Sequence, residues 1–157
     1  MSQEFVAAEV NKIINEESIE FPKNMAMASA WILGNLKGIN LKILDTSETS
    51  SLSDYFIMAS ATNLIQAKSM ADDIVVFMKK HGLTVRSKEG LQGSDWILID
   101  LGDIIVHIFL EAARSVYALE ELWAKAPSVS IPENYYFSSD DAEAAQQIEE
   151  SKDRDFF

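Results

Sequence analysis

The sequence predicts an α/β fold: a mixed sheet of about five strands packed with helices. Residues 95–110 contain two β-branched, apolar runs on either side of Gly102 and Asp103, a pattern typical of a β-hairpin. Residues 64–81 instead repeat apolar side chains at helical spacing. The periodic segments follow one another in the order helix, strand, strand, helix, strand, hairpin, helix, which favours a sheet covered by helices.

The elements before the central helix follow from local signals. Residues 3–17 are expected to form an amphipathic helix, which either packs on the domain or serves a partner or a second copy of the chain. Asn24 is placed to cap a helix over residues 25–36, and Gly38 is placed to end it. Short alternating or apolar runs predict strands over residues 41–45, 55–60 and 83–87.

The helix over residues 64–81 has the clearest boundaries in the chain. Asn63 followed by Gln66 forms a variant of the capping box before its first apolar residues. His81 lies at its end, and Gly82 is expected to be the left-handed residue that follows. The glycine-containing loop over residues 88–94 is too short and wrongly spaced to cradle a phosphate.

The alternation of the hairpin decides which of its side chains share a face. With Gly102 and Asp103 at the centre of the turn, one face is wholly apolar and is expected to be core: Ile97, Ile99, Leu101, Ile104, Val106 and Ile108. The other face is mixed, and its cross-strand pairs are Trp96 with Phe109, Leu98 with His107, and Asp100 with Ile105. Either a helix covers a face of that composition or a partner binds to it.

Composition narrows the classes of partner. The chain has 157 residues, of which 48% are hydrophobic, and a formal net charge of −12. Such a charge repels phosphate backbones, so we expect no direct DNA binding and favour a basic protein partner. The chain has no cysteine, no basic and apolar N-terminal signal, and no apolar run of about 18 residues. We therefore expect a cytoplasmic protein without a membrane span.

Asp100, Asp103 and His107 form the one acid–histidine group that could carry chemistry. A metal site needs three or more converging ligands, and only Asp100 and His107 are expected to share a face. No activated nucleophile and no phosphate-binding loop accompany them. We expect no catalytic residue, no metal and no cofactor, and keep a metal-dependent phosphotransferase or hydrolase as the alternative.

Several spaced motifs then resemble one family. They are Asp95-Trp96, Asp100-x-Gly102-Asp103 and Val106-His107-x-Phe109. Further matches lie upstream in residues 53–57, 71–72 and 89–90, and downstream at Glu111, Arg114, Tyr117, Leu119, Glu120, Leu122 and Trp123. Over residues 26–124 the chain thus resembles the Iojap family, the bacterial ribosomal silencing factors.

The resemblance implies a nucleotidyltransferase-like fold without nucleotidyltransferase chemistry, because the Gly-Ser motif of the active enzymes is missing. It also implies a translational repressor that binds the large ribosomal subunit at its fourteenth protein and blocks joining of the small subunit. A role in large-subunit biogenesis accompanies this in some lineages. Within the matched region we expect these partner-binding residues: Trp96, Asp100, Asp103, His107, Phe109, Glu111, Arg114 and Tyr117.

The chain is expected to divide into three parts. Residues 1–22 form an N-terminal helical extension, through which a homodimer could form. Residues 23–126 form the silencing-factor domain. Residues 127–157 form an acidic, partly disordered tail, because a segment with so few apolar side chains cannot offset the entropy of ordering. Its aromatic cluster is Tyr135-Tyr136-Phe137, and residues 133–137 are the part expected to fold back onto the domain.

Overall fold

The computed structural model describes residues 3–117 and 124–136. Its helices are α1 (Gln3–Ile14), α2 (Lys23–Asn35), α3 (Leu64–Lys80), α4 (Glu111–Tyr117) and the short 3-10 helix η1 (Glu133–Tyr135). Its strands are β1 (Ile39–Asp45), β2 (Tyr55–Ala61), β3 (Ser87–Glu89), β4 (Trp96–Asp100), β5 (Ile104–Leu110) and β6 (Ser128–Val129). None of the described helices is both long and apolar enough to cross a lipid bilayer.

The described strands form one six-stranded sheet in the order β3-β4-β5-β2-β1-β6. β2 and β5 pair in parallel, whereas all the other neighbouring strands are antiparallel. The predicted α/β class with a mixed sheet is confirmed. The strand beyond the expected five is β6, which comes from a segment whose composition is typical of a linker.

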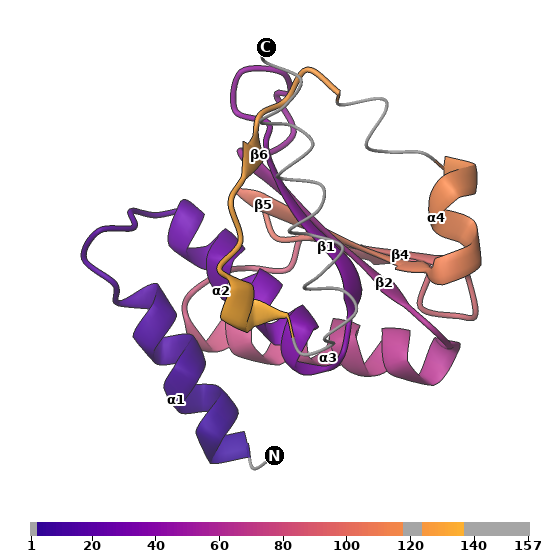
Figure 1. Ribbon diagram of the computed structural model, residues 1–157, viewed down its shortest axis with the longest axis horizontal. Helices are drawn as coiled ribbons and strands as arrows, with labels where there is room; N and C mark the ends of the chain where they lie inside the picture. The colour runs from indigo at the N-terminus through magenta and orange to yellow at the C-terminus, as the bar shows by residue number, and fades with distance from the viewer. Residues whose placement is uncertain (1–2, 118–123, 137–157) are drawn as a thin grey trace.

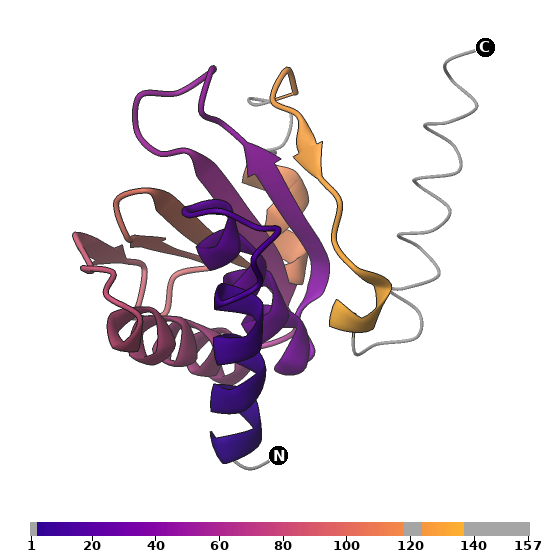
Figure 2. The same ribbon diagram turned by 90° about the vertical axis from the view of Figure 1, so that its left-hand side faces the viewer.

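Helices cover the two faces of the sheet unequally (Figures 1 and 2). α2 and α3 pack directly on one face, and α1 packs outside them against α2. The core lies between these helices and the sheet, and the fully buried side chains Ile57, Val106, Ile74 and Phe77 belong to it. α4 contacts β2 and β5 on the other face.

The predicted hairpin is confirmed down to its register. Trp96 pairs with Phe109, Leu98 with His107 and Asp100 with Ile105, as the alternation requires. The Leu101 amide donates to the Ile104 carbonyl oxygen at 3.0 Å and closes the turn. Gly102 has φ = 89°, a left-handed conformation that suits a residue without a Cβ.

The cap of the central helix is also confirmed. The Asn63 side chain accepts a hydrogen bond from the Gln66 amide at 2.8 Å, and Gly82 follows the helix with φ = 93°. The Gln66 side chain departs from a capping box, because its Oε1 accepts from the Thr62 amide at 2.8 Å. Its Nε2 donates to the Leu36 carbonyl oxygen at 3.0 Å and so ties α3 to the end of α2.

The predicted cap of α2 is wrong. The helix begins at Lys23, and Asn24 lies inside its first turn. The Asn24 side chain has a tertiary role instead, because its Nδ2 donates to the Ile14 carbonyl oxygen at 3.0 Å. At the other end, the left-handed residue is Lys37, with φ = 64°, and Gly38 follows it and donates to the Leu33 carbonyl oxygen at 2.9 Å.

The strand expected over residues 83–87 forms later in the chain. Leu83 is buried in the core, and the pairing with β4 begins when the Arg86 amide donates to the Asp100 carbonyl oxygen at 2.7 Å. The residues that pair, Ser87–Glu89, are all exposed. They carry no alternation of apolar side chains from which a sequence pattern could place them.

Both flanking segments contact the central region. Val6 and Val10 of α1 are buried against it, and Tyr135 is 7% exposed. The expected return of residues 133–137 to the domain is thus observed as far as Tyr136, and Phe137 lies outside the described residues. The domain boundaries after residues 22 and 126 remain a prediction.

Candidate partner-binding face

The candidate site is built on the sheet face that α2 and α3 do not cover. Alternation along β2 and β5 places a second, smaller apolar cluster here, separate from the main core. Trp96 and Leu98 pack at its margin as partly buried side chains. The buried members of this cluster are Leu44, Phe56, Met58, Ile105, Phe109 and Ala126.

Three aromatic side chains support one another on this face. The Trp96 Nε1 donates to the His107 Nδ1 at 3.2 Å, and the Trp96 ring stacks on Phe109 with centroids 5.2 Å apart. His107 also lies against the ring of Phe56, at 4.9 Å. His107 is 3% exposed and Phe109 is 1% exposed, whereas Trp96 is half-buried. Of these three, Trp96 therefore presents surface that a partner could contact directly.

Burial keeps His107 neutral and inert at physiological pH. Desolvation lowers its pKa to about 4. Because Nδ1 accepts the bond from Trp96, the proton of the neutral ring lies on Nε2. That Nε2 is buried and has no hydrogen-bond partner among the residues described. His107 therefore positions Trp96, and its lowered pKa does not suit a general base at neutral pH.

The predicted acids lie at opposite ends of the hairpin. At the turn, the Asp100 Oδ1 accepts from the Gly102 amide at 2.9 Å, and the exposed Asp103 accepts from the Asp54 amide through its carbonyl oxygen at 2.9 Å. Glu111 is exposed at the first turn of α4, beyond the far end of β5. The structure thus brings Glu111 to the end that holds Trp96 and Phe109, and separates Asp100 and Asp103 from it by the length of the strands.

Arg114 anchors α4 to the sheet. Its Nη1 donates to the Ser60 Oγ at 3.1 Å, and Ser60 is fully buried. Sequence reasoning missed Ser60, and its signal is a serine among the apolar residues of strand β2. Tyr117 ends α4, and only its backbone is described. The other family matches, Leu119, Glu120, Leu122 and Trp123, lie outside the described residues.

The alternative reading as a metal-dependent enzyme gains no support from the described residues. No group of three His, Asp or Glu side chains converges there in a way that could hold a metal ion. Asp103 projects from the turn, whereas His107 is enclosed by aromatic rings. The arrangement offers an aromatic contact surface with acidic neighbours rather than a ligand set.

Comparison with known proteins identifies the family. Residues 18–156 match the family model described as "Ribosomal silencing factor during starvation". This chain belongs to the ribosomal silencing factor family. The family resemblance found in the sequence motifs is thereby confirmed. The name of the family is consistent with repression of translation at the ribosome.

Individual relatives agree with this assignment. The ribosomal silencing factor of Haemophilus influenzae is 40% identical over 92 residues, which cover 59% of this chain and 90% of the relative. A crystal structure of a Chromobacterium violaceum protein superposes with a TM-score of 0.60 at 29% identity, covering 80% of this chain and 91% of that one. A more distant relative, the mouse "Mitochondrial assembly of ribosomal large subunit protein 1", is 30% identical over 102 residues, which are 56% of this chain and 44% of the relative.

Proposed function

We propose that this silencing factor represses translation by binding the large ribosomal subunit at its fourteenth protein. Bound there, it occludes the surface on which the small subunit docks, so repression is steric and needs no turnover. The observation that carries the proposal is the match to the silencing-factor family over residues 18–156. Because subunit joining takes place in the cytoplasm, the protein is proposed to act there.

The face around Trp96 is the proposed contact surface. Its indole is held in place by Phe109 and His107, so little side-chain freedom is lost when a partner binds. Trp is favoured at the energetic centre of interfaces. The exposed carboxylate of Glu111 lies at the same end of the hairpin, and a net charge of −12 favours encounter with a basic ribosomal protein.

A role in assembling the large subunit is proposed alongside repression. The mouse relative carries large-subunit assembly in its name, which supports the large subunit as the shared target. A factor that holds the joining face of an unfinished subunit keeps that subunit out of translation, so both roles can use one contact.

Cosedimentation with isolated subunits tests the proposal. The wild-type protein should travel with the large subunit and not with the small one. Trp96→Ala should weaken binding roughly thirtyfold, equivalent to about 2 kcal/mol for a hot-spot residue. Trp96→Phe keeps an aromatic ring at this position and should retain more binding than Trp96→Ala. Glu4→Gln on α1 is the control that removes one negative charge outside the face around Trp96.

Each outcome bears on a different part of the proposal. If the wild type remains at the top of the gradient, the large subunit is not its target. If the wild type binds and folded Trp96→Ala binds equally well, the target stands but the face around Trp96 is not the contact. Near-ultraviolet circular dichroism of each variant checks that its tertiary structure is intact.

A further inference from the structure

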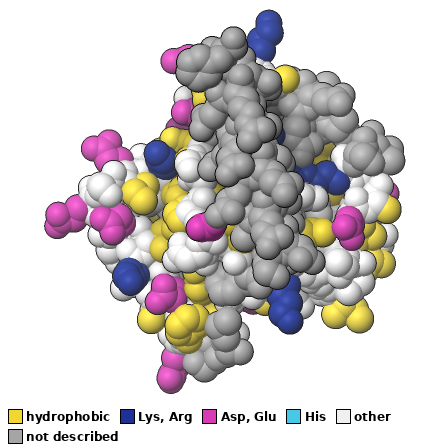
Figure 3. Space-filling model, viewed as in Figure 1, with side chains coloured by type: hydrophobic (Ala, Val, Ile, Leu, Met, Phe, Trp, Pro, Cys, Tyr) yellow, Lys and Arg dark blue, Asp and Glu magenta, His cyan; other side chains and the backbone are white. Residues whose placement is uncertain are grey.

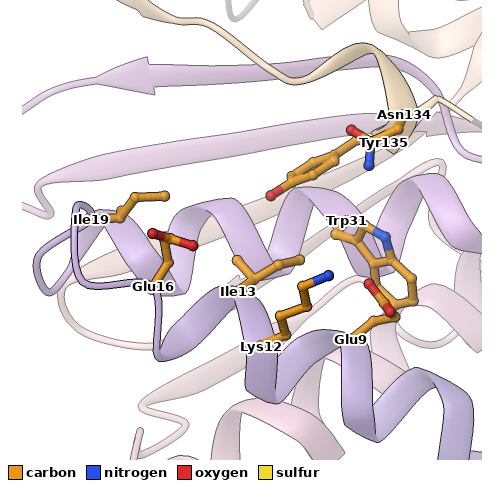
Figure 4. A pocket seen from close by; sticks show the side chains of 8 residues that line it. All are labelled: Glu9, Lys12, Ile13, Glu16, Ile19, Trp31, Asn134 and Tyr135. Carbon is orange, nitrogen blue, oxygen red and sulfur yellow. The ribbon is translucent and has the colours of Figure 1, made fainter.

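A cavity of about 210 Å³ lies on the helical side of the sheet, where α1, α2 and η1 meet (Figure 4). α1 and the residues that follow it contribute Glu9, Lys12 and Glu16 to its wall. Trp31 comes from α2 and Tyr135 from η1. The face around Trp96 lies on the opposite side of the sheet, so this cavity is independent of the function proposed above.

Two aromatic rings line the cavity. Trp31 is 3% exposed and Tyr135 is 7% exposed, so both are fixed by their surroundings. The packing of η1 on α2 depends on Gly34, because a Cβ there would collide with the carbonyl oxygen of Tyr135. The cavity wall is therefore built by close packing of segments distant in sequence.

The Tyr135 hydroxyl is a polar group that faces the cavity. The residue as a whole is buried, but its hydroxyl is not one of the buried polar atoms that lack a partner among the described residues. Figure 4 shows the hydroxyl pointing into the cavity, toward the side on which Glu16 lies. Burial raises the pKa of Tyr135, and the negative charges of Glu16 and then Glu9 raise it further. These carboxylates thus produce a negative potential at the hydroxyl.

The lining favours a cation. Glu9 and Glu16 carry two negative charges against the single positive charge of Lys12, which leaves a net charge of −1. Figure 3 shows further acidic side chains over the loop that joins α1 to α2, where Glu16, Glu17 and Glu20 are exposed. Aromatic rings attract cations through their faces, and a phenolic oxygen can accept a hydrogen bond from one.

We propose that this cavity binds one positively charged side chain, a lysine or an arginine, presented by a basic protein. The ammonium or guanidinium group donates to the Tyr135 hydroxyl between the carboxylates of Glu9 and Glu16. The aliphatic part of the same side chain packs against Trp31 and Ile13. A nucleic acid is excluded as the occupant, because its phosphates would meet a negatively charged wall.

NMR titration of the full-length, 15N-labelled protein tests the site. The probes are Nα-acetyl-lysine methylamide and Nα-acetyl-arginine methylamide, with the norleucine analogue as a neutral control of similar shape. Both cationic probes should shift the Trp31 indole signal and the amides of residues 9–19 and 134–136. The Trp96 indole signal should not move, and the norleucine analogue should shift the cavity signals far less.

Two variants and a matched control assign the contacts. Glu16→Gln should weaken binding of the lysine probe roughly threefold, as expected for the loss of one partly exposed ion pair. Tyr135→Phe removes only the hydroxyl and should weaken binding by a similar factor. Glu4→Gln, on α1 but outside the cavity, should leave the affinity unchanged.

Four results would overturn the proposal. The first is an absence of shifts with millimolar probe, and the second is an equal response to norleucine. The third is an equal loss in Glu4→Gln and Glu16→Gln, which would show a general effect of charge. The fourth is that the free polyamine spermidine binds while a short lysine-containing peptide does not. That result would show that the occupant is a small amine and not the side chain of a protein.

Discussion

His107 shows how the burial of one residue makes stability depend on pH. Its ring is enclosed by Phe56, Trp96 and Phe109, and burial lowers its pKa from 6.5 to about 4. In the unfolded chain the ring regains an ordinary pKa. Between these two values the unfolded state binds a proton that the folded state excludes, so the free energy of unfolding must fall as the pH falls.

The corresponding prediction compares the wild type with His107→Gln, which keeps an acceptor for the Trp96 indole. Between pH 6.5 and about pH 4 the wild type should lose up to about 1.4 kcal/mol of unfolding free energy per pH unit more than the variant does. Urea unfolding of both proteins at a series of pH values measures this difference, in which the titration of the carboxylates cancels.

His81→Gln is the matched control, because it removes the other histidine of the chain, which follows α3 outside the aromatic cluster. Its unfolding free energy is measured across the same pH range. Parallel curves for the wild type and His107→Gln would contradict the assignment of a buried, neutral histidine.

At the scale of elements, the sequence predicts best where a periodic pattern and a local signal agree. The hairpin combines alternation with a glycine turn, and α3 combines helical spacing with Asn63, so both are placed correctly. β3 and β6 consist of exposed or half-buried residues, and their pairing depends on partners elsewhere in the chain. Asn24 has capping chemistry, but it bonds to the end of α1 instead.

The face around Trp96 and the cavity also differ in how far local sequence signals predict them. Alternation places Trp96, His107 and Phe109 on one face, because only local geometry is needed. It does not reveal that His107 and Phe109 are buried there, since their cluster also contains residues from other parts of the chain, such as Phe56 and Ala126. The cavity that joins Glu9 to Tyr135 escapes sequence reasoning for a similar reason: its walls are far apart in the sequence.

Gly34→Ala tests the packing of η1 on α2. Alanine normally stabilises a helix relative to glycine by about 1 kcal/mol. Here the added Cβ would meet the backbone carbonyl oxygen of Tyr135, so we expect destabilisation by about 1–3 kcal/mol instead. Urea unfolding measures the sign, and hydrogen exchange at the Tyr135 amide reports displacement of η1.

Ala8→Gly on the exposed side of α1 calibrates the ordinary helix effect in this protein. It should cost about 1 kcal/mol without changing exchange at Tyr135. A gain of stability in Gly34→Ala would show that η1 can move away at little cost, and that the cavity beneath it is not rigid.

At the scale of the whole molecule, the charge of −12 makes a prediction about rates. If the proposed partner is the basic fourteenth protein of the large subunit, association should be steered by long-range attraction. Raising the salt concentration from about 0.1 M to about 1 M shortens the screening length from about 10 Å to about 3 Å. The association rate should then fall by at least about tenfold.

Stopped-flow mixing with the isolated partner measures both rate constants. The dissociation rate should change much less than the association rate, because the aromatic contacts of Trp96 are not screened by salt. An association rate that does not depend on salt would contradict electrostatic steering, whatever the affinity.

The lateral margins of the sheet have a consequence for solubility. β3 offers three exposed residues, with Lys88 at their centre, and β6 offers only two residues. Natural proteins blunt their sheet edges with short strands and charged side chains, because a long unpaired edge recruits further chains into aggregates. In the described part of this protein both edges are blunted in that way. A second copy of the chain would thus find few unpaired backbone groups at which to add a strand to the sheet. Any dimer is therefore expected to bury helices rather than to continue the sheet.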